Sequence, residues 1–382
     1  MTLTFVTNLV HHHQLPLADE FYKLLGDDYH YIATEPLPDW LIKGGYDPSL
    51  DRPYIIRTYQ SQDAMEEARR LIDESDVVIM GHSPMPWAKK RKKEGKVTFH
   101  ASERPYKKGM TKINHIKAIL ANFKNYGRFK NTYMLCASAY TATDFASTFC
   151  FKNKCFKWGY FTKVDSDFEV EAPKQGASTS EITPLMWCAR FLKLKHPELP
   201  VQLAARLKAK GYRFSIDMFG SGEELENTKN LISQMGVEDC VKLCGNRPNE
   251  EILKEMRKHK IFLFTSDRNE GWGAVLNESM SNGCVPVVSD AIGSAPYLVD
   301  SGNNGFLFES GNIDSLENKV ITLLNNQNLL ATMSSKALFT MRQKWSPKAA
   351  ADNFLELAGY ALRGEMKKYT RIDGPASRDL NN

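Results

Sequence analysis

Apolar residues follow two alternating patterns along this chain. Short runs rich in β-branched and aromatic residues are separated by stretches in which apolar residues recur with helical spacing. In the stretch 61–74, for example, Ala64, Ala68, Leu71 and Ile72 fall on one face of a helix. Strands that alternate with helices are typical of parallel sheets, in which each crossover is usually helical. The pattern therefore predicts an α/β fold.

The alternation occurs twice and is interrupted once. In the first half, strands are predicted at residues 3–8, 29–33, 54–58, 76–81, 96–100 and 132–138. In the second half, strands are predicted at residues 184–190, 213–220, 241–245, 261–266, 285–290 and 305–309. Between the halves, residues 165–183 are polar and rich in Ser, Thr and small residues, which indicates an interdomain connection.

These segments predict a chain of two domains. Ser346 and Pro347 are suited to the N-cap and first turn of a late helix. Two parallel sheets place a cleft between the carboxyl ends of their strands, where ligands of such sheets usually bind. The predicted organisation is an N-terminal domain (1–164), a linker (165–183), a C-terminal domain (184–345), a helix packing back towards the N-terminal domain (346–363) and a mobile tail (364–382).

Composition excludes several classes of protein. Hydrophobic residues make up 42% and charged residues 25%, as in ordinary globular proteins, and no run approaches the roughly 18–20 apolar residues of a membrane span. Residues 1–16 have no basic region ahead of their short apolar run and no small-residue cleavage site, so we expect a first strand, no signal peptide and a cytoplasmic location. The seven cysteines are dispersed and are expected to be reduced thiols; Cys240 and Cys244 have no second pair with metal-ligand spacing, so no zinc site is predicted.

The formal net charge is +5, and the excess lies in the N-terminal half. Residues 1–164 hold 24 Lys and Arg against 17 Asp and Glu, and the densest basic run is Lys89–Lys96. This run is either a solvated helix end or a patch for anionic lipid headgroups or a phosphorylated acceptor. No nucleic-acid partner is expected, because the chain has no recognised binding motif and no aromatic residues interleaved with the cations.

The most informative segment lies between two apolar strands, in the sequence TSDRNEGWGAVLNESMSNGCVPVVSD. The first strand ends in a polar loop with Glu270 and two glycines, and a helix follows. Open backbone N–H groups at a helix N-terminus favour an anion. Glu278 comes eight residues after Glu270, about two helical turns along, on a similar face. Physical reasoning alone leaves two interpretations: a pair of ligand-binding carboxylates, or a capping residue and a surface residue.

The spacing EGWGAVLNE resembles the E-x7-E signature of the retaining glycosyltransferases of family 4, which have the GT-B fold. The flanking sequences ESMSNGCVPV and GSAPYLVDSGNNGFLF are similar to that family as well. The resemblance covers residues 184–362 well and the N-terminal half only loosely. It implies two Rossmann-like parallel-sheet domains facing each other across a cleft.

The resemblance implies a role for each residue on the donor side. Arg190 and Lys195 match the basic pair that binds the donor diphosphate and offsets the charge that builds on the leaving group. Glu278 matches the glutamate that binds the donor ribose, and Glu270 matches the one that contacts the transferred sugar. Gly220 matches a further glycine turn, with an ordinary strand-to-helix turn as the alternative. The backbone N–H groups expected to contact sugar and phosphate are those of Gly271, Trp272, Gly273 and Ala274.

In the N-terminal half the resemblance is looser. His100, at the end of a predicted strand, is expected to contact the donor sugar and to take part in catalysis, with a buried or rim histidine as the alternative. Glu103 and Arg104 follow it and are candidates for the acceptor side, or else form a salt-bridged loop. His82 occupies a comparable strand end.

The first strand is followed by a triplet of histidines where many relatives have a glycine pair. Consecutive residues cannot easily point at one ion, so His11, His12 and His13 are expected to form a polar wall rather than a metal site. His12 and His13 are acceptor-side candidates.

The resemblance implies a retaining transferase that moves a hexose or N-acetylhexosamine from a nucleotide-diphosphate sugar to a glycan or lipid-linked acceptor in surface-polysaccharide assembly. A UDP-sugar is the expected donor and a GDP-sugar the alternative, with no cofactor and no metal; peripheral contact with the inner face of the membrane is a further expectation. Alternatives are a non-catalytic sugar-nucleotide-binding protein and a GT-B sugar-nucleotide epimerase. A phosphorylase would need a pyridoxal-binding lysine, for which no motif is present.

Overall fold

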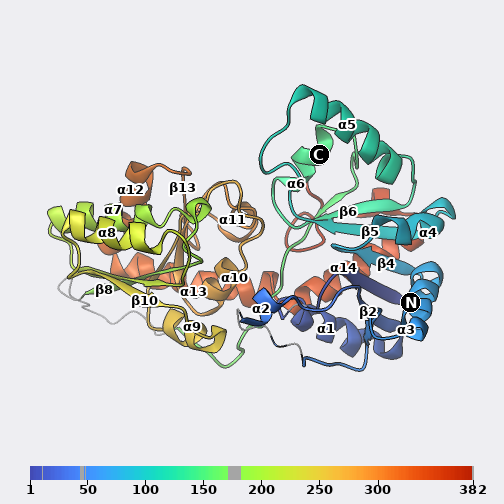
Figure 1. The fold of residues 1–382 in the computed structure, drawn as a ribbon, viewed down its shortest axis with the longest axis horizontal. Coiled ribbons are helices and arrows are strands. Elements are labelled where there is room, and N and C mark those ends of the chain that lie inside the picture. Colours follow the sequence, from blue (N-terminus) through green and yellow to red (C-terminus); the bar gives the residue numbers. More distant parts are fainter. Residues whose placement is uncertain (11, 44–46, 48, 171–181, 381–382) are drawn as a thin grey trace. The chain divides into compact units, whose positions relative to one another are not determined.

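The computed structural model describes the chain except for residues 11, 44–46, 48, 171–181 and 381–382 (Figure 1). The chain divides into two compact units. The N-terminal unit comprises Met1–Lys163 together with Lys344–Asn382, and the C-terminal unit comprises Val164–Gln343. Among the described residues, no helix combines the length and the apolar character that crossing a bilayer requires.

The N-terminal unit is built on a seven-stranded parallel sheet with the order β3-β2-β1-β4-β5-β6-β7. All six strands predicted in this half are present. The seventh was missed, because it has only three residues and lies among lysines. The strands are β1 (Leu3–Thr7), β2 (Tyr29–Ala33), β3 (Ile55–Arg57), β4 (Val77–Met80), β5 (Val97–Ser102), β6 (Thr132–Cys136) and β7 (Cys155–Lys157).

Helices connect these strands and cover the sheet. The helix predicted at 61–74 is α3, which begins after Ser61; the Ser61 hydroxyl accepts a hydrogen bond from the Ala64 amide. Its inner residues Ala68, Leu71 and Ile72 are buried in the core. The helices of this unit are α1 (Leu15–Leu25), α2 (Asp39–Lys43), α3 (Gln62–Glu74), α4 (Lys89–Lys93), α5 (Lys112–Asn122), α6 (Thr141–Ala146) and α14 (Pro347–Leu362).

The C-terminal segment belongs to the N-terminal unit. Helix α14 begins after the Ser346 cap, and its Phe354 ring lies 5.6 Å from that of Phe21 in α1. The residues after α14 were expected to form a mobile tail, but they pack on the sheet instead: Tyr369 is buried, the amide of Lys157 donates to Ser377 O, and the amide of Asp379 donates to Cys155 O. Because β7 is an edge strand, its backbone groups need partners, and this segment supplies them.

The C-terminal unit holds a six-stranded parallel sheet with the order β10-β9-β8-β11-β12-β13. All six strands predicted for this half are present. They are β8 (Thr183–Cys188), β9 (Phe214–Phe219), β10 (Val241–Gly245), β11 (Ile261–Phe264), β12 (Val285–Ser289) and β13 (Phe306–Phe308).

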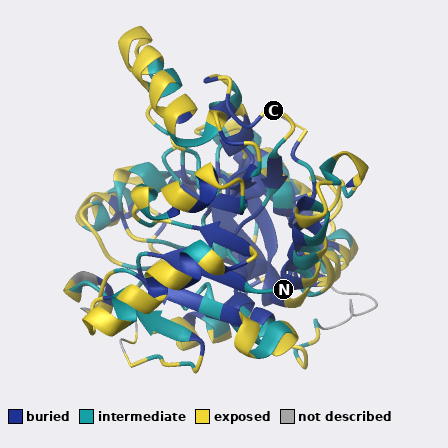
Figure 2. Ribbon diagram, turned by 90° about the vertical axis from the view of Figure 1, so that its right-hand side faces the viewer, coloured by how far each residue is buried: buried dark blue, intermediate teal, exposed yellow. Residues whose placement is uncertain are grey.

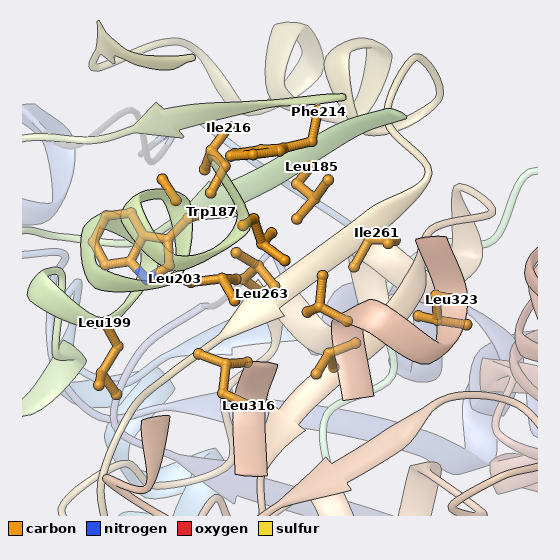
Figure 3. Close-up of a cluster of buried hydrophobic side chains, with 14 of the residues drawn as sticks. Leu185, Trp187, Leu199, Leu203, Phe214, Ile216, Ile261, Leu263, Leu316 and Leu323 are labelled. Carbon is orange, nitrogen blue, oxygen red and sulfur yellow. The ribbon is translucent and has the colours of Figure 1, made fainter. Parts of the chain in front are cut away.

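Seven helices cover this second sheet in the described part of the chain: α7 (Glu198–Ala209), α8 (Leu225–Met235), α9 (Asn249–Met256), α10 (Val275–Ser281), α11 (Ala295–Leu298), α12 (Ile313–Leu324) and α13 (Gln327–Phe339). Leu185, Trp187 and Leu263 from the strands meet Leu203 of α7 and Leu316 of α12 in one buried cluster (Figure 3). In Figure 2 most strands are dark blue and many helices are largely yellow, as expected for sheets buried between helices.

The described part of the predicted linker packs on the C-terminal unit. Arg342 donates to the backbone oxygen of Asp165 at 3.0 Å and pairs with Glu169 at 2.8 Å, and Arg257 pairs with the Asp165 carboxylate at 2.7 Å. Residues 171–181 of the predicted linker lie outside the described residues. The break between the units therefore comes at Val164.

The basic run Lys89–Lys96 is not a continuous surface patch. Arg91 is fully buried: its guanidinium donates to Val97 O at 2.7 Å, and its Nε donates to Thr98 Oγ1 at 3.0 Å. Lys92 is also buried and donates to Asn125 O at 2.9 Å. Burial lowers the pKa of Lys92 to about 8. Two of the five cations of α4 therefore hold helices to the sheet rather than facing solvent.

In both sheets the strand order reverses beside the first strand of the unit. The reversal lies between β1 and β4 in the N-terminal unit and between β8 and β11 in the C-terminal unit. Ligands of parallel α/β sheets bind at such points, outside the carboxyl ends of the strands. The loops after these strands are thus the places to look for a site.

Candidate functional site

The C-terminal unit gathers charged side chains where β8 and β11 end. Lys195 and Glu270 form an ion pair, with both side chains largely buried. Lys195 lies in a 3-10 turn at Lys193–Lys195, ahead of the first residue of α7. This turn brings the ammonium group to the loop that follows β11.

Hydrogen bonds join the two loops beside this ion pair. The Thr265 hydroxyl donates to Lys195 O at 2.7 Å and accepts from Trp187 Nε1 at 2.9 Å. The Asp267 amide donates to Leu194 O at 2.9 Å. The positions of Lys195 and Glu270 are therefore set by backbone and buried side-chain contacts as well as by their own attraction.

His196, which no sequence motif singles out, lies between the two loops. Its ring contacts Glu198 through Nδ1 at 2.7 Å and Asp267 through Nε2 at 3.5 Å. The hydrogen bond with Glu198 raises the pKa of His196, and the Asp267 carboxylate adds to that shift. The residue has a φ of 49°, which is uncommon outside glycine. The sequence does not indicate these contacts of His196, because a single histidine after a lysine has no distinctive spacing.

Arg190 follows β8 and is exposed. In the described part of the chain, its guanidinium forms no ion pair and no hydrogen bond with another residue. An arginine that is held at the end of a central strand without a carboxylate partner can bind an anionic ligand.

Two glycines of the loop after β9 lie against the backbone on either side of Arg190. A Cβ on Gly220 would lie 1.9 Å from Ala189 O, and a Cβ on Gly222 would lie 2.4 Å from Phe191 O. Both have a positive φ, 132° and 152°. Gly220, a predicted donor-binding residue, thus has a definite structural role: it allows the β9 loop to pack on the loop that carries Arg190.

The predicted loop Gly271, Trp272, Gly273 and Ala274 leads into α10. Trp272 is fully buried, and its Nε1 donates to Asn277 Oδ1 at 2.8 Å. Gly273 has a φ of 82°, and a Cβ there would come within 2.7 Å of the Phe264 ring. The close approach explains why a glycine stands at this position.

The two motif glutamates lie in different surroundings. Glu270 is in the loop, five residues ahead of the first residue of α10, so the eight-residue spacing does not correspond to two turns of one helix as predicted. Glu278 lies on α10 and accepts a hydrogen bond from Asn249 Nδ2 at 3.4 Å. Burial raises the pKa of Glu278 to about 7. One carboxylate is therefore balanced by a lysine, while the other is held by an amide.

In the N-terminal unit, His100 does not stand at a strand end. Strand β5 continues to Ser102, and His100 points to the same side as Thr98, towards the helices. Its ring meets Tyr126 edge-on at 4.9 Å, and burial holds its pKa well below the usual range. The position corresponds to the alternative interpretation, a buried histidine.

Glu103 and Arg104, directly after β5, form a salt-bridged loop. Arg104 pairs with Asp144 at 3.1 Å, and Glu103 accepts from Lys107 Nζ at 2.8 Å and from Tyr160 Oη at 2.9 Å. This corresponds to the alternative that the sequence left open for them.

His12, His13 and His82 follow β1 and β4, so they lie along the same edge of the sheet as Glu103. The rings of His12 and His13 are 3.8 Å apart between centroids, and His82 is exposed. His11 lies outside the described residues. The N-terminal unit thus presents histidines at the strand edge where its sheet would bind a ligand.

Comparison with known proteins adds to this geometry. Residues 171–338 match the family model described as glycosyl transferases group 1. The poly(glycerol-phosphate) α-glucosyltransferase of Bacillus subtilis is 33% identical over 165 residues, which is 42% of this chain and 23% of that protein. The amylovoran biosynthesis glycosyltransferase AmsK of Erwinia amylovora is 32% identical over 133 residues, 34% of this chain and 32% of that protein. The match thus spans less than half of the length of these relatives.

Solved structures extend the similarity to nearly the whole chain. Alr3699/HepE of Anabaena, solved in complex with UDP, has a TM-score of 0.68 at 17% identity and covers 94% of this chain and 100% of its own. The expected fold class is thereby confirmed: the chain has the GT-B fold, with two parallel-sheet α/β units.

Proposed function

We propose that this protein is a glycosyltransferase of polysaccharide biosynthesis. It moves a hexose or N-acetylhexosamine from a nucleotide-diphosphate sugar to a glycan or lipid-linked acceptor, with retention at the anomeric carbon. The match of residues 171–338 and the names of the relatives support the class of reaction. The structural observation that carries the proposal is the Lys195–Glu270 pair, held at the switch point of the sheet beside an unpaired Arg190.

In this proposal Arg190 and Lys195 bind the diphosphate. The leaving group gains negative charge as its bond to the sugar breaks, and two fixed cations stabilise that charge without reorganisation. Glu270 balances Lys195 before the donor binds. When phosphate oxygens take over part of the lysine's charge, the Glu270 carboxylate becomes available to accept a hydrogen bond from the transferred sugar.

Glu278 binds the ribose in this proposal. A carboxylate can accept hydrogen bonds from both hydroxyls of a ribose. Because burial raises the pKa of Glu278 to about 7, the group is partly protonated at neutral pH, and ribose hydroxyls would favour its ionised form.

Chemistry at the anomeric carbon then needs no separate side-chain base. The departing phosphate accepts the acceptor proton on the same face, through an oxocarbenium-like transition state. Metal is not required in this scheme, since Arg190 and Lys195 supply the positive charge.

The acceptor is proposed to approach the strand edge that carries His12, His13, His82, Glu103 and Arg104. A catalytic contact of His100 with the sugar remains a prediction, and its burial does not favour it.

A thermal-shift screen tests the proposal. We expect UDP and one UDP-sugar to raise the unfolding temperature, since Alr3699/HepE was solved with UDP and with UDP-glucose; GDP-sugars are the alternative. The shift should persist with a chelator. Lys195→Ala should abolish it, while Lys193→Ala, an exposed lysine of the same turn, should not. Equal shifts for both variants would remove Lys195 from the phosphate site.

The alternatives are separated by what happens to the sugar. A transferase releases the nucleotide diphosphate only when an acceptor receives the sugar. An epimerase changes the sugar-nucleotide without an acceptor, and a binding protein leaves it unchanged. Chromatography of the nucleotide pool with and without acceptor glycan distinguishes the three.

A further inference from the structure

Helix α5 presents its apolar residues to solvent. Four large side chains are exposed on it and on the residue that follows it: Ile113 (69%), Ile116 (62%), Leu120 (67%) and Phe123 (61%). Their spacing of three, four and three residues places them within roughly a quarter of the helix circumference. Helix α5, at the top of Figure 1, also lies at the top of Figure 2 and is yellow over most of its length.

The face of α5 that meets the rest of its unit is mixed: it carries the half-buried Ala118 and Ile119 beside two polar residues. His115 contacts Ser147 O through Nε2 at 2.8 Å, and the buried Asn122 donates to Tyr106 Oη and to Thr148 Oγ1, both at 2.8 Å. A surface helix normally turns its apolar stripe to the core. Here the larger apolar stripe faces solvent instead, so its four side chains contribute little to the packing of the unit. An exposed apolar patch of this kind marks an interaction site.

The charge around the stripe has one sign. From Pro105 to Thr143 the sequence contains seven Lys and Arg and no Asp or Glu. Lys112, Lys117 and Lys124 are exposed and flank the stripe on both sides by helical spacing. An apolar stripe bordered by lysines is the pattern of helices that lie in the plane of a membrane surface.

We propose that α5 docks this protein on an anionic lipid surface. The four apolar side chains enter the boundary between headgroups and acyl chains, and the lysines contact lipid phosphates. A second copy of the chain fits the stripe less well, because a symmetric contact would bring two sets of cations together. A soluble polyanion would satisfy the cations but not the apolar residues. The surface differs from the run Lys89–Lys96, in which Arg91 and Lys92 are buried.

Flotation of the full chain with vesicles tests the proposal. We expect binding to vesicles of phosphatidylcholine with phosphatidylglycerol, little binding to phosphatidylcholine alone, and weaker binding as salt is added. Ile116→Ser with Leu120→Ser should weaken partitioning at least roughly tenfold, since two apolar side chains no longer enter the boundary. Lys112→Gln, Lys117→Gln and Lys124→Gln together should remove the preference for anionic vesicles.

Two control variants change matched residues elsewhere. Leu362→Ser with Ile372→Ser alters two exposed apolar residues (42% and 67%) of the same unit, and Lys89→Gln, Lys90→Gln and Lys93→Gln alter the exposed part of the other basic run. Both should bind vesicles like the unaltered protein. All variants should keep the nucleotide-induced thermal shift, so failure here is distinguishable from failure of the proposed function.

Several outcomes would overturn the proposal. The proposal is wrong if the unaltered chain stays in the unbound fraction, or if the α5 serine variant floats as well as the control. If light scattering shows a dimer for the unaltered protein and a monomer for the α5 serine variant, while vesicle binding is the same for both, the stripe binds a second copy of the chain instead. If the serine variant binds soluble polyphosphate as well as the unaltered protein does, and neither binds vesicles, the cations bind a soluble polyanion instead.

Discussion

The two units of this protein share one architecture but differ in how their candidate residues are held. In the C-terminal unit, the loops after β8, β9 and β11 bond to one another, and these bonds set the positions of Arg190, Lys195 and Glu270. In the N-terminal unit, His100 is buried and Arg104 is paired with Asp144. The difference shows that whether a candidate residue can bind a ligand depends on how the loop that carries it is held in place. The proposed donor residues lie on loops that bond to one another, whereas the proposed acceptor residues lie on loops that follow different strands of the N-terminal sheet.

The largest effect is expected from a substitution that disturbs the contact between the loops after β8 and β9. In Gly220→Ala, the new Cβ would collide with the backbone oxygen of Ala189, so the free energy of unfolding should fall by about 3 kcal/mol or more. Urea unfolding measures this. Gly236→Ala is the control: its φ is also positive, 62°, but nothing lies within 4 Å of the added Cβ, and a loss of about 1 kcal/mol is expected. Equal losses would show that the close approach at Arg190 is unimportant.

The next effect separates binding from catalysis in the C-terminal unit. Glu270→Gln should lower the rate of sugar transfer by about 10²–10³, because the sugar loses a charged partner. The same variant should bind UDP at least as tightly as the unaltered protein, since Lys195 no longer has a carboxylate beside it. Calorimetry with UDP and product formation with a UDP-sugar give the two readouts. A variant with full transfer activity would contradict the assignment of Glu270.

A smaller effect concerns the pH dependence of donor binding. The pKa of Glu278 is raised to about 7, and only the ionised form accepts hydrogen bonds at both oxygens. UDP affinity should therefore increase as pH rises to about 7 and should fall up to roughly tenfold for each unit below it. Glu278→Gln should bind more weakly above pH 7 and lack this part of the pH profile. Parallel profiles for the two proteins would exclude Glu278 as the titrating group.

The smallest effect belongs to the N-terminal unit and concerns stability. The pKa of Lys92 is lowered by burial to about 8, whereas the unfolded chain keeps this proton until about pH 10.4. The unfolded state then binds more protons between these values, so the free energy of unfolding gains at most about 2 kcal/mol as pH rises from 8 to 10. Lys92→Met should be more stable below pH 8 and lose this rise. The exposed neighbour Lys93→Met should behave like the unaltered protein.

The fold was predictable from sequence to a large extent, because alternation of apolar strands and helices is a local signal. All twelve predicted strands exist, including β8 and β11 at the switch point. Strand β7 was not predictable, since its three residues are stabilised by a segment more than two hundred positions later. The end of β5 was misplaced by two residues, and this error placed His100 at an edge where it does not lie.

The candidate site was predictable only where a motif spans several residues. Lys195 and Glu270 came from family-like spacing, and the structure brings them into contact. Physical reasoning on one segment could not show that partnership, because the two residues are 75 positions apart. His196 and the structural role of Gly220 depend on backbone conformation and close approach, which a single sequence does not reveal. The outward direction of the apolar stripe on α5 depends on how the helix packs on its unit, which a single sequence does not show.

The C-terminal segment on β7 also bears on the order in which the protein can fold during synthesis. The C-terminal unit is continuous, Val164–Gln343, and can close as soon as that stretch has left the ribosome. The N-terminal sheet, although made first, receives α14 and its last edge partner only when residues 344–380 emerge. The part of the chain that is translated first is therefore completed last, and its apolar face under α14 stays uncovered throughout translation of the other unit.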